Sequence, residues 1–198
     1  MKRKQPKLKF VNLHGHTCYS IFDGLGYPAD HMDFAYENGL DALAITDHGH
    51  MNAFAQQFFH WRKMKEEGRE FKAIFGVEAY FVPSIKEWEE MKNSDGEADD
   101  DKETSATIIE DEETKKATAR EINRRSHLVL LAQNQKGLNN LFQLVSKSYE
   151  RPNYYRFPRV DLEMLREHSE GIVGTSACLT ADSLLETNLG QMTMSEVV

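Results

Sequence analysis

Cysteine is scarce in this chain and long hydrophobic segments are missing, and each absence excludes a class of protein. Among 198 residues only Cys18 and Cys178 are cysteines, so a disulfide framework is excluded and a reducing, cytoplasmic setting is expected. No apolar run approaches the ~20 residues of a membrane-spanning helix, and no membrane partner is expected. The basic start, residues 1–7, is not followed by an apolar stretch, which argues against a secretory signal.

Acidic residues outnumber basic ones, but the excess is local. The net charge is −8, and residues 86–126 carry 14 acidic and 8 basic side chains, which leaves only −2 for the rest of the chain. Because the remainder is nearly neutral, the overall sign does not argue against a nucleic-acid partner. The acidic range, about residues 84–126, is predicted to be a mobile insertion in one globular domain.

Apolar segments alternate with helical patterns along the rest of the chain. Buried strands are predicted at residues 10–13, 41–46, 72–82, 127–132 and 171–177, and helices at 28–39, 52–68, 137–149 and after Asp161. The stretch between the last two helices, RPNYYRFPR, reads as an aromatic and basic loop. This alternation predicts an α/β fold with a largely parallel sheet or barrel, whose functional residues gather where strands end.

Metal-binding side chains stand at those strand ends. His14 and His16 close the first strand, His48 closes the second, and Cys178 closes the fifth. Residues at i and i+2 of an extended backbone point the same way, so His14 and His16 can converge on one point. Imidazole and carboxylate groups are the ligands that Zn²⁺, Mn²⁺ or Fe²⁺ requires, and a metal site is therefore predicted.

Two further residues bear on this site. Glu78 is the only charge in the apolar third strand, where a carboxylate is costly to bury unless it is paired or bound to a cation. His127 stands at the start of the fourth strand rather than at its end. In a parallel sheet it would face the opposite rim, so spacing alone does not nominate it.

Five motifs follow one another in an order typical of one family. NLHGHTCYSIFDG, ALAITDHG, FGVEAYFV, HLVLLAQNQKGLNNLFQLVSKSY and EGIVGTSACL together resemble the polymerase and histidinol phosphatase (PHP) domain. The version most similar is the one at the N-terminus of bacterial replicative DNA polymerase III alpha subunits. The resemblance covers about residues 8–179, apart from the acidic insertion.

The resemblance implies a distorted seven-stranded (β/α) TIM-like barrel that holds up to three metal ions, Zn or Mn. Carried over by motif, the metal ligands are His14, His16, Asp23, His48, Glu78, His127 and Cys178. Asp47 is expected to orient a ligand or hold its tautomer. Family members that keep these ligands resemble metal-dependent phosphoesterases with 3′–5′ exonuclease activity on DNA, whereas others keep the domain only as a scaffold.

The family closes its site with a late Asp-x-His pair, and no such pair follows Cys178. The barrel is therefore expected to be incomplete over residues 1–177, and the polymerising palm, fingers and thumb are absent. The expected partners are a downstream polymerase chain, DNA and other replisome subunits.

Residues 178–198 depart from the family pattern and resemble the first block of an intein. The run starts with Cys178 and continues through an Asp-Ser pair and an apolar strand to Thr187 and Gly190. In an intein the Cys178 thiol attacks the Ala177 carbonyl and converts the peptide bond to a thioester. No Thr-x-x-His block or terminal Asn follows, so splicing would need a second chain. Cys178 would then belong to the intein, and the partner chain would supply the metal-binding cysteine.

Alternatives remain open at this stage. An unusual polymerase helix or a fragmentary gene model would also explain the last 21 residues. The domain itself could instead be a free-standing histidinol-phosphatase-like phosphoesterase, which the polymerase-type motif GLNNLFQLVSKSY disfavours, or a catalytically silent scaffold stabilised by metal.

Overall fold

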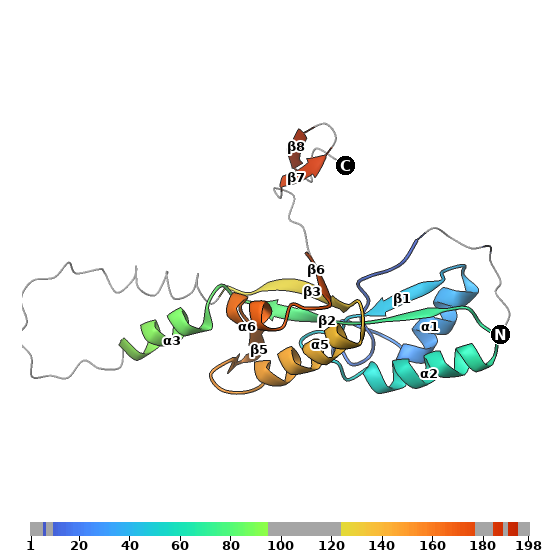
Figure 1. The fold of residues 1–198 in the computed structure, drawn as a ribbon, viewed down its shortest axis with the longest axis horizontal. Coiled ribbons are helices and arrows are strands. Elements are labelled where there is room, and N and C mark those ends of the chain that lie inside the picture. The colour runs from blue at the N-terminus through green and yellow to red at the C-terminus, as the bar shows by residue number, and fades with distance from the viewer. Residues whose placement is uncertain (1–5, 7–9, 95–123, 177–183, 188–189, 194–198) are drawn as a thin grey trace, which may run out of the picture.

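The computed structural model describes residues 6, 10–94, 124–176, 184–187 and 190–193 (Figure 1). These residues form a mixed α/β fold with one six-stranded sheet and a separate two-stranded pair. The elements are α1 Pro28–Glu37, β1 Ala42–Ile45, α2 Phe54–Glu66, β2 Lys72–Phe81, α3 Ile85–Ser94, β3 Ser126–Ala132, α5 Gln135–Ser148, β4 Tyr154–Tyr155, β5 Phe157–Val160, α6 Leu162–Glu167, β6 Ile172–Ser176, β7 Leu184–Thr187 and β8 Gly190–Thr193. No described helix is long and apolar enough to cross a membrane.

Strand β2 organises the sheet because it pairs with three other strands. Its first half, Lys72–Phe75, runs parallel to β1, and its end pairs in parallel with β5. Its second half pairs antiparallel with β3, which in turn pairs antiparallel with β6. The prediction of a largely parallel sheet is therefore wrong for β3. The reversal sets His127 opposite Tyr80, near the end of β2. His127 therefore does not lie at the opposite rim, where a parallel β3 would have placed it.

The predicted first strand is only partly formed. Asn12 makes an isolated parallel bridge with Leu43, and the main-chain N–H of Ala44 donates to the carbonyl of Asn12 at 2.8 Å. Phe10 is 60% exposed, so the predicted burial is wrong. Within the described residues this segment has a strand neighbour on one side only. It still runs beside β1, and no pairing among the described residues joins it to β6.

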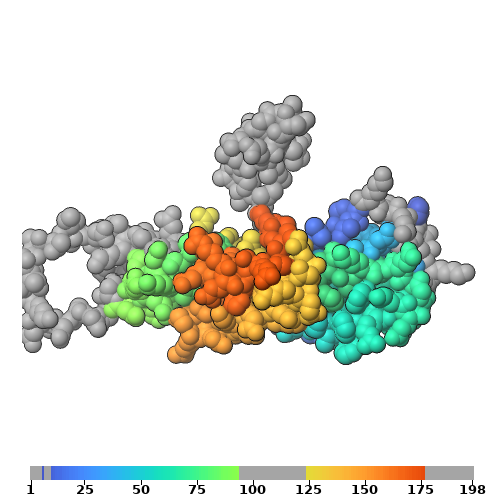
Figure 2. Space-filling view, in the orientation of Figure 1, coloured from blue at the N-terminus to red at the C-terminus, as the bar shows by residue number. Residues whose placement is uncertain are grey.

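Two hydrophobic clusters flank the middle of β2 and hold it in place. One joins α1, β1 and α2 through buried Met32, Leu43 and Met64, and the other joins β2, α5 and α6 through buried Val77 and Leu141. In Figure 2 the green to blue atoms around α2 lie at one end of the described fold, and the orange atoms of the α6 region lie nearer the other. Glu78 stands between Val77 and Ala79 of the second cluster along β2.

Side-chain caps begin two of the described helices. Asn134 begins α5 by accepting from the N–H of Gly137 at 2.9 Å, and Asp161 begins α6 by accepting from that of Met164 at 3.0 Å. Helix α2 instead begins at Phe54, after Ala53 and with no side-chain cap, so the predicted start at residue 52 is two residues too early.

The two predicted loops contain regular structure. Within residues 151–159 lies the short antiparallel pair of β4 and β5. Within the range 84–126, α3 starts at Ile85, which is 3% exposed and donates its N–H to Asp161 at 3.1 Å. Residues 95–123 lie outside the described residues.

Candidate metal centre

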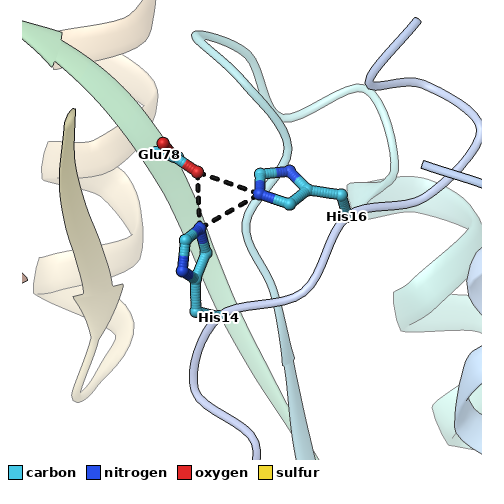
Figure 3. Close-up of side chains that lie close together, drawn as sticks. All are labelled: His14, His16 and Glu78. Atoms are coloured by element: carbon cyan, nitrogen blue, oxygen red, sulfur yellow. Dashed lines mark hydrogen bonds and ion pairs between the residues drawn. The ribbon is translucent and has the colours of Figure 1, made fainter. Parts of the chain in front are cut away.

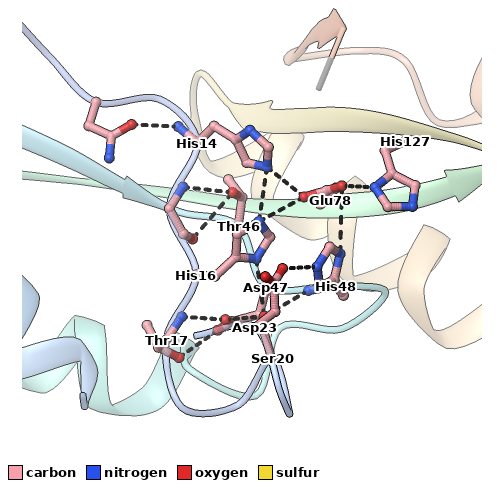
Figure 4. A network of polar contacts seen from close by, with 12 residues as sticks. His14, His16, Thr17, Ser20, Asp23, Thr46, Asp47, His48, Glu78 and His127 are labelled. Carbon is pink, nitrogen blue, oxygen red and sulfur yellow. Dashed lines mark hydrogen bonds and ion pairs between the residues drawn. The ribbon is translucent and has the colours of Figure 1, made fainter. Parts of the chain in front are cut away.

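The site lies where three segments converge on Glu78 of β2. His14 and His16 follow the Asn12 bridge, His48 follows β1, and His127 opens β3 (Figure 4). A parallel bridge between His48 and Glu78 and the antiparallel register of β3 bring these segments side by side. All of them face Glu78, whose side chain is 1% exposed.

One oxygen of the Glu78 carboxylate meets the His-x-His motif. The Nε2 atoms of His14 and His16 lie 2.5 and 2.9 Å from Glu78 Oε2, and they lie 3.0 Å from each other (Figure 3). The two side chains therefore converge as their spacing predicts. The rings meet edge to face, with centroids 4.9 Å apart.

The other oxygen of Glu78 meets the later histidines. His127 Nδ1 contacts Glu78 Oε1, and His48 Nδ1 lies 3.6 Å from the same atom. On its far side, His48 Nε2 lies 2.6 Å from the Oδ2 of Asp23, a carboxylate that is 57% exposed. Glu78 thus bridges two groups of potential ligands, and Asp23 extends the second group toward solvent.

Electrostatic coupling keeps these carboxylates ionised. Burial raises the pKa of Glu78, but hydrogen bonds from His16 and His14, with the charges of His48 and His127, outweigh it and lower the pKa to about 2. The hydrogen bond to Glu78 is the main reason that the pKa of His16 is raised. The hydrogen bond from His48 lowers the pKa of Asp23. A deep carboxylate that stays anionic among imidazoles attracts cations.

A network behind the ligands fixes the tautomer of one histidine. Asp47 is 1% exposed and accepts from the N–H and hydroxyl of Thr17 at 2.7 and 2.9 Å and from the hydroxyl of Ser20 at 2.7 Å. Because the Ser20 hydrogen is given to Asp47, the Nδ1–H of His16 donates to Ser20 Oγ, at 3.1 Å. In the neutral ring the lone pair of His16 then lies on Nε2 and faces Glu78, whereas in the protonated ring the same nitrogen donates to Glu78.

That arrangement fits a metal ion. A neutral His16 directs a lone pair at a carboxylate oxygen 2.9 Å away, and two acceptors at this distance repel unless a proton or a metal ion lies near both. The buried Nδ1 of His48 has no hydrogen-bond partner. Three overlapping groups place one ligand atom from each member within 4.8 Å of the others: His14, His16 and Glu78; His16, Asp23 and His48; His48, Glu78 and His127. Nitrogen and carboxylate oxygen suit Zn²⁺ or Mn²⁺.

Glycine shapes the loop that returns Asp23 to the site. A Cβ on Gly24 would lie 2.0 Å from the carbonyl oxygen of Thr17, so only glycine lets this loop fold against the first motif. The preceding Phe22 has a φ of 71° and a fully exposed ring. The loop therefore fixes the Asp23 carboxylate next to His48.

The structure brings six of the seven predicted ligands together: His14, His16, Asp23, His48, Glu78 and His127. Cys178 lies outside the described residues. Asp47 contacts no imidazole and reaches His16 through Ser20. The sequence analysis gave no role to Thr17 and Ser20. Their position between the candidate ligands His16 and Asp23 could have suggested that they support the site. The ligand assignments themselves stay predictions.

The family follows from a comparison with known domains. A model of the PHP domain matches residues 12–187, which is most of the chain. The chain belongs to the PHP domain family. The PHP match includes all six clustered residues and extends past Ala177 through the end of β7.

Among curated relatives, the DNA polymerase III subunit alpha of Deinococcus radiodurans is 36% identical over 90% of this chain and 11% of that protein. The protein of the same name from Mycobacterium tuberculosis is 30% identical over 92% of this chain and 14% of its own length. The PHP chain thus spans only 11–14% of these relatives. A solved Bifidobacterium adolescentis protein described as a candidate metal-dependent phosphoesterase gives a TM-score of 0.40 at 16% identity over 73% of this chain and 34% of its own, too weak to establish a shared fold.

Proposed function

We propose that this PHP domain is the N-terminal part of a replicative DNA polymerase III alpha subunit, and that its cluster hydrolyses phosphodiesters at a DNA 3′ end. The observation that carries the proposal is the surrounding of the buried Glu78 carboxylate. Each ion pair that it forms with a described residue is with a histidine. The relatives named above support the polymerase context. The domain would act in the cytoplasm, with DNA, the remaining polymerase chain and other replisome subunits as partners.

The residues divide the chemistry among themselves. His14, His16 and Glu78 would hold one ion, and the groups that contain Asp23, His48 and His127 would hold up to two more. Divalent ions acidify a bound water molecule and clamp a phosphoryl group for displacement. Ser20 would keep His16 in the tautomer that binds metal, and a substrate would approach from the side of the exposed Asp23.

The experiment measures metal content and hydrolysis on the same preparations. The chain, alone and joined to its downstream polypeptide, is assayed with 5′-labelled single-stranded DNA and with histidinol phosphate. We expect bound Zn or Mn and shortening of DNA from the 3′ end, both lost in His14→Ala and kept in His168→Ala, a histidine at the end of α6. Release of phosphate from histidinol phosphate would favour the small-molecule alternative. Bound metal without turnover on either substrate would favour the scaffold.

We further propose that residues 178–198 are an intein N-terminal segment that splices in trans. In the first step the sulfur of Cys178 bonds to the carbonyl carbon of Ala177, the Ala177–Cys178 C–N bond breaks, and the freed amine takes the thiol proton. The sequence supports this through its leading cysteine and Asp-Ser pair, and Leu184–Thr187 is a strand paired with β8.

Mixing this chain with the downstream polypeptide tests the splicing proposal. A ligated product that lacks residues 178–198 is expected, and Cys178→Ala should prevent it, whereas Cys18→Ala should not. Ligation that survives Cys178→Ala would remove the intein assignment and return Cys178 to the PHP domain as a candidate ligand.

A further inference from the structure

A second surface of the chain combines cationic and aromatic side chains. It is formed by α3, the start of β3 and the β4–β5 pair, and we name it the arginine–aromatic surface. Its cationic members are Lys92, Arg125, Arg151 and Arg156, and its aromatic members are Trp88, Tyr154, Tyr155 and Phe157. An open groove of about 680 Å³ lies between α3 and residues 151–156, and a smaller one of about 150 Å³ adjoins it at Arg125. The ring of Trp88 on α3 packs against that of Tyr155, with centroids 4.6 Å apart.

The charge of this surface is strongly one-sided. Five cationic side chains line the two grooves, the fifth being the buried Arg159, and the only carboxylate among the lining residues is Glu89. Lys92, Arg125 and Arg156 are exposed and form no ion pair within the described part of the chain. The chain as a whole has a net charge of −8, so this surface is opposite in sign to the average of the chain. Free guanidinium groups in a groove suit a polyanion.

The aromatic rings are positioned to stack. The guanidinium of Arg125 lies 3.6 Å from the centroid of the Phe157 ring, and that of Arg156 lies 5.6 Å from Tyr155. Tyr154 is 45% exposed and stacks on Tyr149 at 5.8 Å. Cationic groups that track a backbone, together with rings on which bases stack, are the features by which proteins bind single-stranded nucleic acid.

The surface is continuous with the metal centre. The ring of Phe157 lies 5.3 Å from that of Tyr80, and Tyr80 lies 5.3 Å from His127 and stacks on His48 at 6.0 Å. Arg125 stands two residues before His127, and its guanidinium lies 5.5 Å from the centroid of the Tyr80 ring. A chain of rings therefore connects the grooves to two candidate ligands.

We propose that the arginine–aromatic surface binds a single-stranded nucleic acid and guides its end to the metal centre. The inference rests on the proposed phosphodiester chemistry, and it names the structural feature that would select a polymer over a small phosphate ester. Phosphates would contact Arg125, Arg151 and Arg156, and bases would stack in the groove beside Trp88 and Tyr154.

Binding is measured on the full chain in EDTA, so that it does not depend on metal or turnover. A fluorescein-labelled oligo(dT) and an oligo(U) of equal length report affinity by anisotropy over a range of salt concentrations. The chain has two tryptophans, and we expect the nucleic acid to quench Trp88, so the quenching should disappear in Trp88→Phe but not in Trp61→Phe.

Matched variants locate the contacts. Arg125→Gln and Arg156→Asn each remove one charge, and asparagine tolerates the positive φ of 61° at position 156. Each should make the slope of log K against log salt shallower by about 0.7, the value for one phosphate contact on a single strand. Arg125→Lys should restore the slope, and Tyr154→Ala should weaken binding at least about fivefold. Arg62→Gln on α2, an exposed arginine elsewhere, is the control and should change neither.

Native salt slopes in both arginine variants would overturn the proposal, as would displacement of the oligonucleotide by poly-glutamate at equal charge concentration, which would point to an acidic polypeptide. Hydrolysis of bis(p-nitrophenyl) phosphate reports the metal centre separately. Failure of that reaction with intact oligonucleotide binding would reject the proposed function alone. Normal hydrolysis with unchanged binding in the variants would reject the surface alone.

Discussion

Two clusters in this chain are each centred on a carboxylate, but the side chains that surround the two carboxylates differ. On α1, Asp33 accepts from His60 of α2 at 2.9 Å and pairs with Arg69, which is 5% exposed and also pairs with Glu67 at 2.8 Å. In the middle of β2, Glu78 is surrounded by four imidazoles instead (Figure 4). Both clusters join elements that are distant in sequence, but only the first contains a permanent cation.

The difference separates a structural ion pair from a metal centre. Arg69 is charged at every accessible pH, so the Asp33 cluster carries its own counterion. An imidazole, unlike a guanidinium, gives up its charge on deprotonation, so the buried Glu78 has no permanent counterion among the described residues, and an external cation would supply one. Removal of the central acid or its partner should therefore affect metal binding in one cluster and folding in the other.

The largest expected effect is loss of metal in Glu78→Gln. The amide keeps the shape of the side chain but removes the charge shared by the proposed ion sites, so metal affinity should fall by more than about 100-fold, beyond the range seen for residues that only support ligands. Metal content after dialysis measures it. Glu37→Gln, at another buried glutamate, is the control. Retention of native metal content in Glu78→Gln would contradict the assignment.

Arg69→Met should lower the stability of the fold and leave metal binding unchanged. It leaves Asp33 partly buried without its cation, and the free energy of unfolding should fall by about 3 kcal/mol, the lower end for a broken buried pair because Asp33 is 31% exposed. Urea unfolding measures the loss. Metal content should not change. A loss of metal in folded Arg69→Met would show that the two clusters are coupled.

Stability against pH should distinguish the clusters in metal-free protein. The raised pKa of His16 stabilises the fold below the ordinary imidazole value near 6.5, and this contribution is lost as the pH rises through the folded-state pKa. The lowered pKa of Glu78 stabilises above 4.5 and is lost as the pH falls toward about 2. The pair thus contributes most between about pH 4.5 and 6.5.

The Asp33 pair shows no such upper limit. The pKa of Asp33 is lowered by Arg69 and His60 against the effect of burial, and the pKa of Arg69 is raised by Asp33, again against burial. Its contribution is therefore lost only on acidification below the ordinary aspartate value. Urea midpoints measured in EDTA from pH 6 to 8 should fall for the native chain and stay flatter for Glu78→Gln. Equal slopes would show that His16 and Glu78 are not coupled.

The sequence predicted the parts of this comparison that depend on local pattern. The apolar runs located β1, β2 and β3, and the i, i+2 spacing of His14 and His16 correctly predicted that they converge. The isolated charge of Glu78 indicated its special position because an apolar strand does not bury a carboxylate without a partner.

Local sequence pattern could not predict how segments that are distant in the sequence pair with one another. An apolar strand has the same pattern in either direction, so the reversal of β3 could not be read, and His127 entered the prediction only through the family resemblance. The exposure of residues 10–13 depends on how many strands flank them, which no local pattern records. The role of Ser20 requires contact with Asp47, 27 positions away.

The smallest expected effect tests that last contact. Ser20→Ala removes the hydroxyl that accepts from His16 Nδ1 and from the main-chain N–H of His48 at 3.2 Å, and His16 is then free to place its proton on Nε2. Metal affinity should fall by about 10-fold, the lower end for a residue that orients a ligand. Ser148→Ala is the matched control, because Ser148 is equally buried, at 2% exposed, and its hydroxyl donates to the carbonyl of Val145 on α5. Titration with Zn²⁺ measures both variants. Equal affinities in the two would show that the tautomer of His16 is set by Glu78 and the bound ion alone, and Asp47 would then act on the fold of the first motif rather than on its ligands.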